Sequence, residues 1–195
     1  MKKPLCLALL MVAFSACTLA KVDVNVVSER TALENQVLGS YNALTQDVLL
    51  VASVRGVDPT GAIKTPPPKS REYKNGVKAV ETLAFHQDDV DAFKQLGWVG
   101  ENIQGRLTAF PMQREDVPED LHAFATRYQQ AEFDAVASQV NQARDVVMER
   151  VVETNPDLTE KALTRIRRIF ARLHRDNALP GDKIQQENGV WMVKK

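Results

Sequence analysis

Residues 133–151, FDAVASQVNQARDVVMERV, decide the fold class because their apolar side chains recur at steps of three and four. The recurring positions are Phe133, Val136, Val140, Ala143, Val147 and Val151. This period places them on one face of an α-helix. An isolated helix gains little stability from propensity alone, so its apolar face must dock against other elements. We therefore expect the domain around this stretch to be mainly helical.

Helical spacing extends in both directions from this stretch. Upstream, a separate apolar stripe ends at Tyr128, five residues before Phe133, so the two stripes are out of phase. The mismatch predicts a bend, or two helices that meet near Gln130. Downstream, Pro156 cannot continue the preceding helix, and a last helix carries the apolar positions Leu163, Ile166, Phe170 and Leu173. Further helices are expected at residues 28–55, 74–85 and 88–96.

Two short β-hairpins are predicted around glycine-containing turns. Residues 98–101 and 105–107 flank a tight polar connection, and residues 184–187 and 190–193 flank Asn188-Gly189. Asn-Gly between apolar segments is a strong short-range signal for a hairpin. The predicted fold class is therefore mainly α (α+β), a helical hairpin or bundle with short β-hairpins and a long proline-rich loop.

The proline-rich loop is expected at residues 56–76. It contains Thr65-Pro66-Pro67-Pro68, whose consecutive prolines favour an extended, solvated polyproline segment. A surface loop or linker explains this segment, and a ligand for a proline-recognition module is the alternative. The helical domain with its β-hairpins is then expected to occupy residues 77–195.

The first residues resemble an export signal. Lys2 and Lys3 precede an uncharged apolar run over residues 4–16, which predicts a signal peptide at residues 1–16. Phe14-Ser15-Ala16-Cys17 looks like a bacterial lipobox, so Cys17 is expected to become the acylated (palmitate-bearing) first residue of the mature chain. Residues 17–27 would then form a lipid-anchored segment with a short strand. Cleavage after Ala20 is the alternative, which would give a soluble periplasmic protein.

Composition and motifs exclude several classes of protein. The 25 basic residues balance the 25 acidic ones, which excludes the strong positive charge of a DNA-coating protein. Two cysteines cannot build a disulfide scaffold. The three histidines lie far apart and outside any HExxH motif, and neither a Gly-x-Ser-x-Gly elbow nor a phosphate-binding loop occurs. We expect no metal, no cofactor, no nucleic acid partner and no enzymatic activity.

Two groups of side chains are candidates for binding. Four arginines, Arg165, Arg168, Arg172 and Arg175, recur with helical spacing on the last helix and suit phosphate groups or an acidic partner. Alternatively, they pair with Glu132, Glu149 and Glu153 of the preceding helix. Trp98 follows Gly97 and Trp191 lies two residues after Gly189 in the predicted hairpins, either as exposed contact residues or as cover for a small core. If both hairpins pack on the helices, the two indoles are expected in one cluster.

Two segments resemble a known family. Gly97-Trp98-Val99-Gly100-Glu101, and Pro180-Gly181 followed by Ile184-Gln185 and Gly189-Val190-Trp191, are similar to the YdbL-type family of bacterial envelope proteins, a domain of unknown function. The resemblance begins at about residue 97, and it suggests that this chain is a longer, lipoprotein-like member of that family. It implies a periplasm-facing accessory protein working beside an AsmA-like lipid-transport protein or another lipoprotein, and it supplies no catalytic residues.

These observations give an ordered set of functional expectations. The first is a non-enzymatic lipoprotein on the periplasmic face of the outer membrane, where Thr18 after Cys17 would direct it. Its role would be that of an accessory protein in outer-membrane maintenance or lipid transport. The alternative is a periplasmic protein that binds a lipid or small molecule between helices, which a sizeable apolar cavity would favour. A hydrolase is the remaining alternative.

Overall fold

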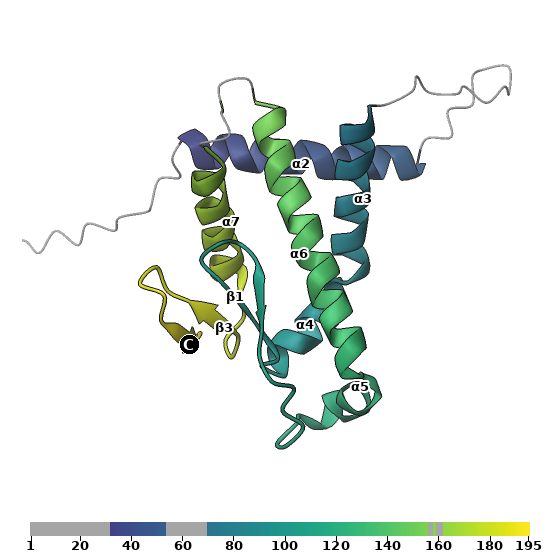
Figure 1. Cartoon of the computed structure of the whole chain (residues 1–195), viewed down its shortest axis with the longest axis vertical. Coiled ribbons are helices and arrows are strands. Elements are labelled where there is room, and N and C mark those ends of the chain that lie inside the picture. Colours follow the sequence, from purple (N-terminus) through teal and green to yellow (C-terminus); the bar gives the residue numbers. More distant parts are fainter. Residues whose placement is uncertain (1–31, 54–69, 156–157, 159–161) are drawn as a thin grey trace, which may run out of the picture. The chain divides into compact units, whose positions relative to one another are not determined.

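The computed structural model describes residues 32–53, 70–155, 158 and 162–195, with side chains of the first helix described for residues 33–46 (Figure 1). The expected signal peptide, Cys17, the short strand within 17–27 and the three consecutive prolines lie outside the described residues. Over the described part the fold is mainly α with a small β-sheet, as expected.

Helices account for most of the described chain. They are α2 (Ala32–Ser53), α3 (Arg71–Phe85), α4 (Gln87–Gln95), the 3-10 turn η1 (Glu119–Leu121), α5 (His122–Arg127), α6 (Gln130–Glu153) and α7 (Leu163–Asn177). The strands are β1 (Val99–Glu101), β2 (Leu107–Ala109), β3 (Lys183–Gln185) and β4 (Trp191–Val193). Since α6 and α7 follow one another and contact each other, they form a helical hairpin (Figure 1).

The break between α5 and α6 confirms that two helices meet near Gln130. Tyr128 adopts an extended conformation after α5, and Gln129 begins the new helix. The side chain of Glu132 accepts a hydrogen bond from the backbone N–H of Gln129 at 3.0 Å. This capping arrangement satisfies a backbone donor that the start of a helix leaves unpaired.

The start of α3 corrects the expected loop boundary. The Ser70 hydroxyl accepts a hydrogen bond from the backbone N–H of Tyr73 at 3.2 Å and caps the helix, and Glu72 lies in its first turn. The helix therefore begins at Arg71, three residues before the start expected at residue 74, and residues 71–76 of the expected proline-rich loop are helical. Likewise, α4 begins at Gln87, one residue before the start expected at residue 88, and Asp88 lies in its first turn.

Both predicted hairpins are present and join into one sheet, although the second strand of the first hairpin is Leu107–Ala109 and not residues 105–107. The strand order is β2-β1-β3-β4. β1 pairs antiparallel with β2, and β3 pairs antiparallel with β4 across Gly189, whose φ is +83°. The two hairpins meet through a parallel pairing of β1 with β3, in which Gly100 lies opposite Lys183. The two segments that carry the family resemblance are thus neighbours in space.

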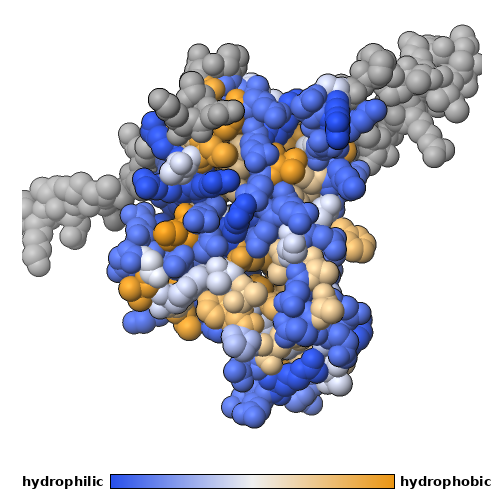
Figure 2. Space-filling model, in the orientation of Figure 1, coloured by the Kyte–Doolittle hydropathy of each residue, from blue (hydrophilic) through white to orange (hydrophobic). Residues whose placement is uncertain are grey.

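The core consists of two clusters that share α6. One cluster gathers aliphatic side chains of α2, α3, α6 and α7 around Val147 and Ile166. The other is aromatic and surrounds Phe93, Trp98 and Phe133, between α4, β1, α5 and α6. The face in Figure 2 is largely hydrophilic over the described residues, with hydrophobic side chains in small groups. None of the described helices is long and apolar enough to cross a membrane.

Candidate functional site

A buried carboxylate, Glu101, lies where β1 meets two helices. The Glu101 side chain is 1% exposed. Arg144 of α6 binds both of its carboxylate oxygens, at 2.6 Å from Nη1 and 3.1 Å from Nη2, and Lys94 of α4 contacts the Oε1 oxygen at 2.7 Å. The same guanidinium donates to the backbone carbonyl of Gly105 at 3.2 Å. A buried charge is costly unless it is paired, and here two cations pair it.

The electrostatics of this cluster leave an excess of positive charge. Burial alone would raise the pKa of Glu101, but the charge and hydrogen bonds of Arg144, helped by Lys94, hold that pKa well below its usual range. Glu101 is therefore ionised at neutral pH. Two cations face one carboxylate, so the Lys94–Glu101–Arg144 cluster carries one net positive charge.

His174 of α7 borders the same cluster and is electrically neutral. Burial lowers the pKa of its imidazole to about 3, and the positive charge of Arg144 acts in the same direction. The residue keeps some accessible surface because its ring borders a cavity. At neutral pH the imidazole can therefore donate or accept a hydrogen bond without adding charge.

The charged cluster forms one end of a cavity of about 310 Å³ between α2, α3, α4, α6 and α7. Its remaining wall is largely apolar and is made by Leu38, Tyr41, Leu83, Val90, Val140, Val147, Phe170 and Leu173. The polar end is lined by Gln87, Asp91, Lys94, Arg144, His174 and Asn177. The Asp91 carboxylate accepts hydrogen bonds from Gln87, 3.0 Å to each oxygen. Apolar walls with a few convergent polar groups are typical of small-molecule sites.

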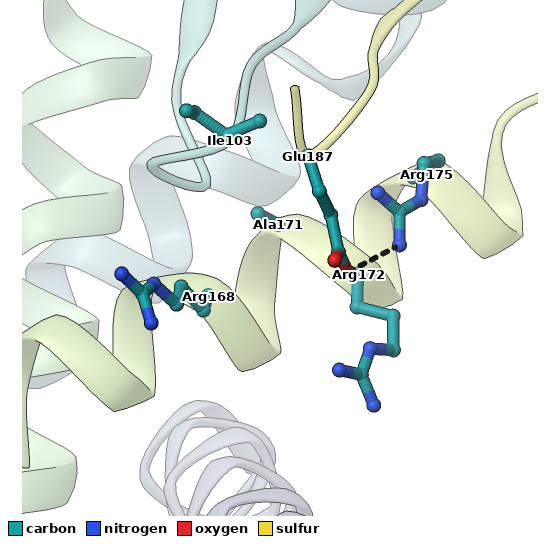
Figure 3. A pocket seen from close by; sticks show the side chains of 6 residues that line it. All are labelled: Ile103, Arg168, Ala171, Arg172, Arg175 and Glu187. Atoms are coloured by element: carbon teal, nitrogen blue, oxygen red, sulfur yellow. Dashed lines mark ion pairs between the residues drawn. The ribbon is translucent and has the colours of Figure 1, made fainter. Parts of the chain in front are cut away.

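The four arginines predicted as a binding stripe lie on α7 and differ in their partners. Arg172 contacts Glu34 of α2 at 2.5 Å, and Arg175 lies 3.7 Å from Glu187 in the turn between β3 and β4 (Figure 3). Neither Arg165 nor Arg168 has an ion-pair partner among the described residues.

The expected acidic partners of this stripe, Glu132, Glu149 and Glu153, do not pair with it within the described chain. Glu132 caps α6, and Glu153 contacts Arg150 of its own helix at 2.9 Å. That alternative is therefore wrong for this structure. The acidic partners come instead from α2 and from the C-terminal hairpin.

The two tryptophans do not share a cluster, so that expectation is wrong. Trp98 is fully buried, stacks near Phe93, and donates from its indole nitrogen to the backbone carbonyl of Gln113 at 2.8 Å. It is a core residue and not an exposed contact. Trp191 is partly buried and packs edge-on against Phe110, with ring centroids 5.0 Å apart.

Sequence reasoning missed Lys94, Arg144 and His174 as members of a site. One signal was available, since Arg144 occupies an inward position of the α6 stripe, one turn after Val140. His86 contacts Asp89 at 3.3 Å and Gln139 at 3.2 Å. Over the described residues, no group of three or more His, Cys, Asp or Glu side chains is arranged to hold a metal ion.

Comparisons with known proteins identify no relative of this chain. No family model, no curated protein and no solved structure matches the chain. The geometry of the site is therefore the main basis for a functional proposal.

Proposed function

We propose that the described domain binds a small anionic amphiphile, such as a fatty carboxylate, in the cavity between its helices. The supporting observation is a largely apolar cavity whose lining brings together two cationic side chains, Lys94 and Arg144. The anionic group would lie against this end, and the apolar chain would lie against the aliphatic and aromatic wall. A neutral His174 would donate a hydrogen bond to the anion.

Binding accounts for this site better than catalysis does. Among the described side chains that line the cavity there is no serine, threonine or cysteine to act as a nucleophile. The Arg144–Glu101 pair also holds β1 against α6, so its geometry is tied to the fold. We therefore prefer a ligand-binding role over the hydrolase alternative.

The cellular setting in this proposal comes from the sequence. We place the protein on the periplasmic face of the outer membrane, anchored through an acylated Cys17, and working beside an AsmA-like protein in lipid transport. A domain that holds single amphiphiles fits such a role. Mass spectrometry of the mature N-terminus tests the anchor. A diacylglyceryl and palmitoyl modification on Cys17 would support it, and an unmodified start at Lys21 would overturn it.

The first test of ligand binding is Lys94→Gln. This change removes one of the two cationic groups that line the cavity and keeps the Arg144–Glu101 ion pair, so the domain should stay folded. Isothermal titration of the full mature chain should show that decanoate binds the wild type and binds the variant about tenfold more weakly or worse, because a charge-assisted contact is lost. Affinity for decan-1-ol should not change. The exposed Lys74→Gln serves as a matched control that leaves both affinities unchanged.

A second variant tests the cavity itself. Leu38→Trp adds bulk to the wall and leaves every charge in place, so it should weaken decanoate and decan-1-ol together. Leu121→Trp, at a similarly half-buried leucine outside the cavity, should weaken neither. The proposal is wrong if the wild type does not bind decanoate, or if decanoate binds Leu38→Trp as tightly as the wild type.

A further inference from the structure

A second hollow, of about 420 Å³, lies on a different side of α7 from the cavity. Its helix wall carries Arg168, Arg172 and Arg175, whose spacing of four and three residues places them on one face (Figure 3). Ile103, from the turn between β1 and β2, and Glu187, from the turn between β3 and β4, face this helix across the hollow. The hollow is thus lined by α7 and by the turns of both β-hairpins.

The charges in this hollow are unevenly paired. Arg168 has no hydrogen bond or ion pair within the described residues. Among the described residues, the Arg175 side chain has one ion-pair partner, Glu187, at 3.7 Å, and the Glu187 side chain is 78% exposed at the tip of a hairpin. Such an exposed pair contributes little stability. An incoming anion can therefore replace Glu187 without breaking a buried ion pair.

We propose that this hollow binds a phosphate monoester group, presented by a lipid headgroup or by a soluble phosphorylated molecule. When Glu187 swings out, Arg168 and Arg175 offer two positive charges, which match the charge of about −1.5 to −2 on a phosphate monoester at neutral pH. Guanidinium groups suit the oxygens of phosphate because they donate two parallel hydrogen bonds. Arg172, which also lines the hollow, stays paired with Glu34.

The site is separate from the amphiphile cavity, although both use α7. The helix presents Leu173, His174 and Asn177 to the cavity and Arg168, Arg172 and Arg175 to the hollow. The phosphate proposal therefore does not rest on the proposed function. Lys94→Gln should leave phosphate binding unchanged, so the failure of one proposal is distinguishable from the failure of the other.

The test compares two arginines of the same helix in the full mature chain. Arg168→Gln removes the unpaired guanidinium in the hollow, whereas Arg165→Gln removes an equally exposed arginine that does not line it. Phenyl phosphate, titrated by isothermal calorimetry, should bind Arg168→Gln about tenfold more weakly than the wild type. Arg165→Gln should change the affinity by less than about twofold, because it alters only the surrounding potential. Glu187→Gln should strengthen binding.

Vesicles distinguish the two sources of the phosphate group. Phosphatidylcholine vesicles containing phosphatidic acid present a phosphate monoester, and vesicles containing phosphatidylglycerol present only diesters. Preferential binding to phosphatidic acid that Arg168→Gln abolishes would support a lipid headgroup. Binding of phenyl phosphate without vesicle binding would support a soluble ligand. The absence of phenyl phosphate binding, or equal losses in Arg168→Gln and Arg165→Gln, would overturn the proposal.

Discussion

At the level of single residues, Gly100 leaves less room for a side chain than any other glycine in the described part of the chain. A Cβ atom there would lie 2.6 Å from Cζ3 of Trp191 and 2.9 Å from both Cβ and the carbonyl oxygen of Lys183. We predict that Gly100→Ala lowers the free energy of unfolding by about 1–3 kcal/mol, because the two hairpins must move apart. Urea denaturation measures this change.

Gly39 of α2 supplies the matched control for that substitution. A Cβ atom at this position would meet nothing within 4 Å. Gly39→Ala should therefore leave stability unchanged or raise it by up to about 1 kcal/mol, since alanine is the better helix former. If the two substitutions change stability equally, steric contact with Trp191 and Lys183 is not the reason for glycine at position 100.

His174 makes stability depend on pH in a defined window. Its folded pKa of about 3 lies below the ordinary value of 6.5, so the unfolded chain binds a proton there that the folded chain does not. Stability should therefore fall as pH drops below about 6.5, by at most ~1.4 kcal/mol per pH unit. We predict that His174→Gln flattens this slope between pH 7 and 5, measured by urea denaturation. His122→Gln, at an exposed histidine, should keep the wild-type slope, and a slope unchanged in His174→Gln would contradict the prediction.

At the scale of elements, helix α6 closes one edge of the sheet. Asn141 donates to the backbone carbonyl of Leu107 at 2.9 Å and accepts from its N–H at 2.8 Å, as a neighbouring strand would. Leu107 is buried in the edge strand β2, so its backbone groups need these partners. We predict that Asn141→Ala lowers the free energy of unfolding by about 1–3 kcal/mol.

Thermal and urea denaturation measure what the Asn141–Leu107 hydrogen bonds contribute to stability, with Gln142→Ala as the control for Asn141→Ala. Gln142 is an exposed amide one residue further along the same helix, bonded only to Ser138 of α6 among described contacts. Its loss should change stability by less than about 0.5 kcal/mol. A similar small effect at Asn141 would mean that solvent replaces its bonds to Leu107 without cost.

At the level of the whole molecule, the sequence predicts the helices and strands better than it predicts the tertiary contacts between them. The α6 stripe and Asn188-Gly189 are local signals, and both predictions are confirmed. The parallel pairing of β1 with β3 and the contact of Arg144 with Glu101 join distant parts of the chain, so no local pattern encodes them. The same limit explains the tryptophans, since Trp98 and Trp191 have similar neighbours in sequence and different surroundings in space.

The parallel pairing between the hairpins also bears on the order in which the molecule assembles. Lys183 donates to the carbonyl of Gly97, 86 residues earlier, so this contact closes a long loop. Contacts of such separation form late and slow the folding of a domain. A growing chain would carry an uncovered β1 edge until the residues of β3 and β4 have emerged, and during that interval the edge is open to pairing with a neighbouring chain.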